Sequence, residues 1–190
     1  MFIFRSFTVS PVTIRQIFVK LLALIFFPLI SFAQIKLDEK ITLLDQKVEI
    51  TVPSELTTMT NEMWKLKYRN AERPILALSD KNVEVNLIGQ FTNQQWDEKS
   101  LQDYVYFRIA NLKKTRTDTE ILENGVKDVA GRKVGYFKFT SEAIGSKIFN
   151  YYFFTLVDGK IFLFAFNCIE KLRGIWEKTT DEMVASLRTK

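Results

Sequence analysis

The chain contains no histidine, which removes the side chain that most often acts as a general base near neutral pH and most often binds metal. The usual partner of a serine or cysteine nucleophile is absent for the same reason. Catalysis by carboxylates alone would need paired acids, such as Asp97 with Glu98 or Asp181 with Glu182. Adjacent acids at a helix start more often cap the helix and complement its dipole. We therefore expect no catalytic residue, and an enzyme of unknown type is the less favoured interpretation.

Cys168 is the only cysteine, so no internal disulfide can form. It ends a strongly apolar segment, where a free cysteine behaves as a small apolar side chain; an intermolecular disulfide is the alternative. The sequence has no glycine-rich phosphate loop, EF-hand spacing or CxxC pair. It therefore predicts no bound metal and no cofactor.

Arg108 is the cation with the most informative position. The long helix expected up to about residue 114 places Leu101, Val105, Ile109 and Leu112 on one side, and Arg108 falls within that side. Its side chain must either extend past the apolar residues to water or find a carboxylate. In the second case, Arg108 would anchor an acidic group of a ligand or partner in a cleft between this helix and a sheet.

The other cations give no reason to expect a polyanionic partner. Residues 113–116 are the densest basic cluster, but they lie at the C-terminus of this helix, where the helix dipole favours cations. Three of the 27 Lys and Arg residues and none of the 22 acids precede residue 34, so the rest of the chain has a net charge near +2. Nucleic acids and anionic membrane surfaces both need clustered cations, and we expect neither as a partner.

Residues 147–168 form the strongest local pattern, two apolar runs around Asp158 and Gly159. Asp-Gly favours a two-residue type I′ turn, which fixes the pairing of the two strands. One face then consists almost wholly of aromatic rings: Phe149, Tyr151, Phe153, Phe162, Phe164 and Phe166. These rings form either the floor of the core beneath a helix or a partly open pocket or interface. Together with Arg108, they are the candidate binding residues.

The first 33 residues have the pattern of a signal peptide. Three basic residues precede an apolar run at residues 21–30, and small residues stand where a signal peptidase cleaves, between Ala33 and Gln34. Pro28 interrupts a run already shorter than the roughly 20 residues of a membrane span. We expect a periplasmic or secreted bacterial protein without a membrane span after cleavage; a leader retained as an anchor is the alternative.

The remaining patterns predict a loose lead-in over residues 34–46 and a single domain over residues 47–190. Residues 133–140 form a strand whose Phe137 and Phe139 face the core, and Thr179 with Glu182 has the spacing of a capping box at the start of a C-terminal helix. The other expected elements are a strand at 48–52, a short helix at 60–68, a hairpin of 75–78 with 83–91, and a strand at 120–122.

Four segments carry a resemblance to a known family: Val48-Glu49-Ile50-Thr51-Val52-Pro53, Lys65-Leu66-Lys67-Tyr68 with Arg73-Pro74, Gly131-Arg132-Lys133, and Met183-Val184-Ala185-Ser186-Leu187. With the order of elements, they resemble the PsbP-like superfamily, which includes the bacterial DcrB-like proteins. The resemblance covers nearly all of residues 34–190. It implies an α+β fold, with an antiparallel sheet of about six to seven strands flanked by helices in a PsbP-like α/β/α sandwich. It also implies binding and assembly roles, and it transfers no catalytic residue.

These observations predict a non-enzymatic exported envelope protein that binds an envelope protein or an apolar small molecule. The alternative is a chaperone-like or structural assembly factor of the cell envelope. A pocket beside the aromatic face would favour ligand binding, whereas a flat exposed apolar patch would favour assembly.

Overall fold

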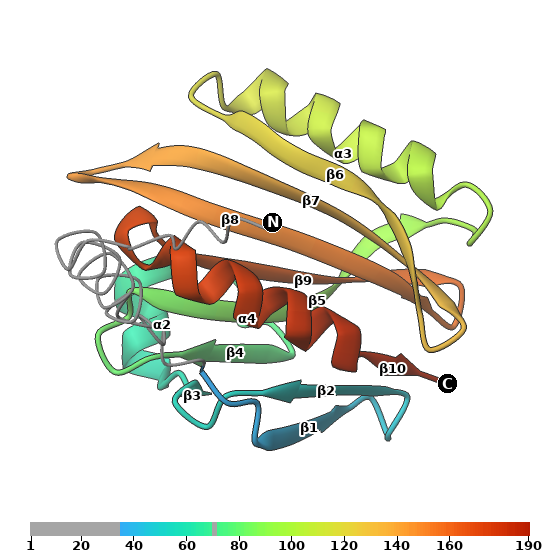
Figure 1. The fold of residues 1–190 in the computed structure, drawn as a ribbon, viewed down its shortest axis with the longest axis horizontal. Coiled ribbons are helices and arrows are strands. Elements are labelled where there is room, and N and C mark those ends of the chain that lie inside the picture. Colours follow the sequence, from blue (N-terminus) through green and yellow to red (C-terminus); the bar gives the residue numbers. More distant parts are fainter. Residues whose placement is uncertain (1–34, 70–71) are drawn as a thin grey trace, which may run out of the picture. The chain divides into compact units, whose positions relative to one another are not determined.

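The computed structural model describes residues 35–69 and 72–190, whose course Figure 1 shows. The signal peptide expected at residues 1–33 lies outside the described residues. None of the helices in the described part combines the length and the apolar character needed to cross a membrane.

The described residues form two antiparallel sheets and three α-helices. The large sheet has the order β3 (Thr57–Thr58), β4 (Leu76–Ser79), β5 (Val85–Gln95), β9 (Lys160–Ile169), β8 (Ser146–Val157), β7 (Arg132–Ala143) and β6 (Glu120–Val129). The small sheet has the order β1 (Glu39–Leu43), β2 (Val48–Val52) and β10 (Arg188–Thr189). The helices are α2 (Asn61–Tyr68), α3 (Leu101–Thr115) and α4 (Arg173–Ser186), the last preceded by a 3₁₀ turn, Glu170–Leu172. The α+β class and the seven-stranded sheet agree with the prediction, whereas the small sheet was not predicted.

The hairpin of β8 and β9 turns at Asp158 and Gly159, whose φ angles of 51° and 73° are both positive, as a type I′ turn requires. A two-residue loop leaves one possible register. Phe153 pairs with Phe164, Tyr151 with Phe166 and Phe149 with Cys168, which is the pairing that a two-residue turn at Asp158 and Gly159 predicts.

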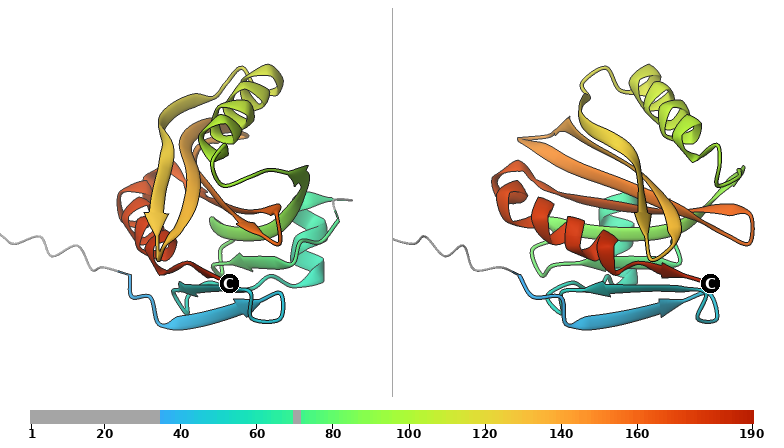
Figure 2. Two further views of the ribbon diagram at one scale, coloured as in Figure 1. Left: turned by 90° about the vertical axis from the view of Figure 1, so that its right-hand side faces the viewer. Right: turned by 45° about the vertical axis from the view of Figure 1, so that its right-hand side comes forward.

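Both faces of the hairpin are covered, because both are apolar. On one face, its rings form a buried cluster with β2 and α4, to which Ile50, Trp176 and Met183 contribute. On the other face, a second buried cluster includes Leu101 and Val105 of α3. Figure 2 shows α3 and α4 on opposite sides of the large sheet. The core is therefore two layers deep, with the hairpin in the middle.

The contact between α3 and the large sheet depends on a glycine. Gly135 of β7 pairs with Phe154 of β8, and a Cβ at Gly135 would collide with the Phe154 ring. That ring meets Tyr104 of α3 edge-on, with centroids 4.8 Å apart, and both side chains are fully buried. The missing side chain thus makes room for an aromatic contact that holds α3 in place.

The loose lead-in predicted for residues 34–46 is wrong, because it contains β1. In β1, Ile41 pairs with Ile50 of β2, and Lys40 forms an ion pair of 2.7 Å with Glu49. As an edge strand with only partial burial, β1 carries polar residues that disguise its strand pattern.

The predicted start of the C-terminal helix is also wrong. Helix α4 begins at Arg173, so Thr179 and Thr180 lie within it. Their hydroxyls donate to the carbonyl oxygens of Ile175 and Trp176 at 3.0 and 2.7 Å. A threonine that bonds four residues back can occupy a helix interior, and the spacing of Thr179 and Glu182 therefore does not mark a cap here.

Candidate functional site

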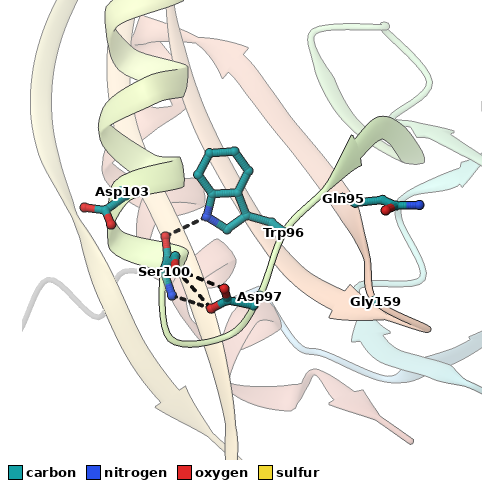
Figure 3. Close-up of a pocket in the computed structure, with 6 residues that line it drawn as sticks. All are labelled: Gln95, Trp96, Asp97, Ser100, Asp103 and Gly159. Carbon is teal, nitrogen blue, oxygen red and sulfur yellow. Dashed lines mark hydrogen bonds between the residues drawn. The ribbon is translucent and has the colours of Figure 1, made fainter.

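An open hollow of about 560 Å³ lies where the end of β5, the loop into α3 and the β8–β9 turn meet. We call it the end hollow (Figure 3), and it is lined by Gln95, Trp96, Asp97, Ser100, Asp103 and Gly159. A smaller hollow of about 330 Å³ shares Gln95 and is also lined by Phe91, Thr92, Gln94 and Lys160. Both hollows include the end of β5. This strand continues beyond residue 91 through a β-bulge, so that Gln95 still pairs with Lys160.

The loop between β5 and α3 is held by hydrogen bonds around Ser100. The indole N–H of Trp96 donates to the Ser100 carbonyl at 2.7 Å. Asp97 Oδ1 accepts from the Ser100 N–H at 2.8 Å and from its hydroxyl at 3.1 Å (Figure 3). The bond from the Ser100 N–H is the main reason why the pKa of Asp97 lies below its ordinary value. Asp97 is therefore ionised at neutral pH and helps to shape the loop.

Helix α3 exposes two aromatic rings, and one of them packs on a ring that lines the end hollow. Trp96 packs on Tyr104 and on Phe107, with centroids 5.2 and 6.0 Å away. Phe107 is 38% exposed and its neighbour Tyr106 is 57% exposed. We call Trp96, Tyr106 and Phe107 the aromatic ledge. Tyr104, which packs beneath the ledge, is buried, and its hydroxyl donates to Gln94 Oε1 at 2.8 Å. The ledge therefore packs on an ordered side chain.

A second group of polar residues surrounds Lys138 on the opposite face of the sheet, beside α4. Only 5% of the Lys138 side chain is exposed. Its Nζ lies 3.0 Å from Glu123 Oε2 and 3.2 Å from both Glu177 Oε1 and Asp181 Oδ2. The Tyr151 hydroxyl donates to Asp181 Oδ1 at 2.9 Å. We call these five residues the lysine cluster.

The electrostatics of the lysine cluster keep its lysine charged. Burial acts to lower the pKa of Lys138, but hydrogen bonds and attraction from Glu123, Asp181 and Glu177 together raise it. Burial, followed by the charge of Asp181, raises the pKa of Tyr151 far above its ordinary value. Near pH 7, Lys138 therefore stays charged and the Tyr151 hydroxyl stays neutral. The cluster is an ion-pair network that joins α4 to β6, β7 and β8.

The described residues contain no group of three or more His, Cys, Asp and Glu side chains placed to hold a metal ion. The three acids of the lysine cluster, Glu123, Glu177 and Asp181, surround the ammonium group of Lys138 instead of a metal ion.

The six aromatic candidates lie together and are inside the protein. Phe149, Tyr151, Phe153, Phe162, Phe164 and Phe166 each have no exposed surface. Their rings pack on one another, as in the Phe153–Phe164 stack with centroids 4.9 Å apart, and against α4 and β2. A ligand on this face would have to separate the small sheet and α4 from the large sheet. A binding role for the six rings stays a prediction.

Arg108 lies apart from those rings, on the α3 side of the sheet, and it is half-buried. Burial raises the pKa of Tyr152, and the charges of Arg108 and Arg116 act against that shift. Within residues 35–69 and 72–190, Arg108 forms no ion pair with a carboxylate, which fits a side chain that extends to water. A role as an anchor for an acidic group stays a prediction.

The other candidates have structural surroundings. Glu98 Oε1 accepts from the Lys133 backbone N–H at 2.8 Å, and Asp181 belongs to the lysine cluster. Cys168 is fully buried, and burial raises the pKa of its thiol to about 12, as expected for an apolar environment. Arg116, at the end of α3, is paired with Asp118 at 2.6 Å.

The sequence interpretation missed the aromatic ledge and the lysine cluster. A helical wheel of α3 could have revealed the ledge, because Phe107 lies opposite the apolar side that Leu101 and Val105 define. Glu177 and Asp181, four residues apart, could have indicated an acidic stripe on α4. Nothing local indicated that this stripe faces Lys138, because their contact depends on the packing of distant segments.

No protein-family model matches the chain, and no curated protein matches it. The chain is similar to the solved structure of cyanobacterial PsbP (CyanoP) from Synechocystis sp. PCC 6803, with a TM-score of 0.58 and 11% identity over 86% of this chain and 99% of that one. It is also similar to LpqN of Mycobacterium tuberculosis, with a TM-score of 0.52 and 9% identity over 75% of this chain and 83% of that one. The fold is PsbP-like. At these identities, the PsbP-like likeness concerns the fold alone, and the DcrB-like assignment stays a prediction.

Proposed function

We propose that this chain is a non-enzymatic exported protein of the cell envelope that binds another protein through the aromatic ledge and the end hollow. The observation that carries the proposal is the exposure of two aromatic rings of α3, Tyr106 at 57% and Phe107 at 38%, of which Phe107 packs on Trp96 of an open hollow. They are the most exposed aromatic rings of the described residues. Aromatic side chains are enriched at protein interfaces, because they offer a large rigid contact area.

A protein partner suits this surface better than an apolar small molecule. Small-molecule pockets are mostly apolar and enclose most of their ligand. The end hollow is open, and four of its six lining residues, Gln95, Asp97, Ser100 and Asp103, are polar. The apolar rings of the hairpin, which would suit such a molecule, are closed off in the core.

Export is part of the proposal and rests on the signal-peptide pattern of residues 1–33. An envelope role is also supported by the fold shared with LpqN, a protein described as involved in cell envelope biogenesis. N-terminal sequencing of the protein from its own host should find Gln34 as the first residue. Recovery of Met1 in a membrane fraction would contradict export as a soluble protein.

Capture from envelope extract tests the binding role. The domain from residue 34 onward is immobilised as wild type, as the double variant Tyr106→Ser with Phe107→Ser, and as the control Ile144→Ser. Ile144 is fully exposed at the β7–β8 turn, so the control removes an exposed apolar side chain outside the ledge. We expect a protein that wild type and control retain and the double variant does not. Identical retention by all three would contradict the proposal.

A further inference from the structure

The outward face of α3 carries a regular stripe of exposed residues. Asp103, Phe107, Ala110 and Lys114 follow one another at spacings of four, three and four, and all four are exposed. Such spacing places side chains along one side of a helix, as in a two-stranded coiled coil. The stripe lies opposite Leu101 and Val105, which face the large sheet, and α3 is an outer layer of the described fold in both views of Figure 2.

Opposite charges lie at the two ends of this outer stripe. Asp103 lies in the first turn of α3 and Lys114 in the last, with Phe107 and Ala110 between them. Neither Asp103 nor Lys114 has an ion-pair partner within the part of the chain that the structure describes. The stripe is therefore complementary to itself when it is turned end for end.

We propose that the outer stripe of α3 binds the same stripe of a second copy of this chain, with the two helices antiparallel. About a two-fold axis midway along the stripe, Asp103 meets Lys114 of the second copy, and Phe107 meets the small Ala110. Each contact then occurs twice, as in any two-fold symmetric interface. The inference rests on the proposed function, because Phe107 belongs both to the aromatic ledge and to the outer stripe.

The outer stripe is short, so the contact between two copies buries little surface. A helix of 15 residues is roughly 22 Å long, so one helix pair buries less than the roughly 800 Å² per partner of a standard interface. The dimer should therefore be weak and transient. Added salt should weaken the dimer, because both of its ion pairs are exposed.

Charge exchange between two variants tests the pairing by sedimentation equilibrium of the domain from residue 34 onward. Asp103→Lys places lysine at both ends of the stripe, and Lys114→Asp places acid at both ends. Each variant alone should bind itself at least about tenfold more weakly than wild type, because like charges meet. An equimolar mixture should recover wild-type affinity within about threefold, because opposite charges then meet at both ends. Lys178→Asp, at an exposed position of α4, is the control and should leave self-association unchanged.

Ala110→Glu gives a test that does not depend on charge exchange. It keeps a good helix former at an exposed position, so α3 should remain folded, while the longer side chain meets Phe107 of the second copy and should abolish the dimer. Circular dichroism and thermal unfolding verify the fold of every variant. A mixture that associates no better than its components overturns the inference. If the ledge still captures another protein in that case, the proposed function stands and only the second copy is excluded as the partner.

Discussion

Replacing Lys138 by methionine should destabilise the domain by about 2–3 kcal/mol. Removing one partner of a fully buried ion pair costs about 3–5 kcal/mol, whereas an exposed pair contributes about 0–1 kcal/mol. The lysine cluster lies between these limits, because Lys138 is 5% exposed while its three acids are 27–50% exposed. Each acid also keeps another partner: Arg173 for Glu177, the Tyr151 hydroxyl for Asp181, and the Tyr136 hydroxyl for Glu123.

Equilibrium unfolding in urea at pH 7 measures this loss, since guanidinium chloride is a salt and would screen the charges. Lys133→Met is the matched control in the same strand. Lys133 is 45% exposed and pairs with the exposed Asp128, so its replacement should cost less than about 0.5 kcal/mol. If Lys138→Met costs no more than this control, the lysine cluster does not stabilise the docking of α4.

The cost of Lys138→Met should also depend on pH. For Glu123, burial raises the pKa, but the hydrogen bonds from Lys138 and Tyr136 outweigh it, and the net shift is downward from the ordinary value of 4.5. A carboxylate with a depressed pKa stabilises the fold above its unfolded pKa and loses that contribution as the pH falls through its folded pKa. The difference between wild type and variant should therefore shrink below about pH 4.5. A difference that stays constant down to pH 3 would contradict this account.

Three further predictions concern other parts of the domain. Phe153→Ala should cost about 3–5 kcal/mol in urea unfolding, because its ring is fully buried, while Leu66→Ala, at a side chain 87% exposed, should cost less than about 0.5 kcal/mol; a loss below about 1 kcal/mol for Phe153→Ala would indicate an open aromatic face. Cys168 should react with DTNB, a colorimetric thiol reagent, far more slowly in the folded than in the unfolded protein, because burial raises its pKa to about 12; equal rates would disagree with a buried thiol. The hydrogen bond from Arg116 is the main reason why the pKa of Asp118 falls from 3.8 to about 2, so its stabilising contribution is complete above about pH 4 and lost as the pH falls toward 2. Asp118→Asn should remove that part of the acid dependence, and identical acid unfolding curves for variant and wild type would count against it.

The parts of the fold that the sequence predicted well are those set by local chemistry. Asp158 and Gly159 allow one kind of turn, and that turn determines every pair between β8 and β9. The apolar spacing of α3 and the burial of Cys168 follow in the same way from residues close to them in the chain. Each of these features can be predicted from residues that are close together in the sequence.

The features that the sequence did not predict depend on contacts between distant segments. Lys138 alternates with apolar neighbours in β7, a pattern typical of a solvent-facing position. It is buried because Glu177 and Asp181, about forty residues later, cover it. The same holds for β1, whose polar residues indicate a strand only once β2 lies beside them. The end hollow likewise requires three segments that no local pattern joins.

The edge-on contact between Phe154 and Tyr104 has a consequence for the entropy of association through α3. A partner that meets mobile side chains must restrict their motion, and this restriction weakens binding. Phe107 stacks on Tyr104, which is itself held between Trp96 and the Phe154 ring that Gly135 accommodates. The Phe107 ring is thus largely ordered before a partner binds. Binding through a small contact area therefore loses little free energy to the restriction of side-chain motion. Gly135→Ala, at a residue buried in the sheet, would then weaken association at a surface that it does not touch.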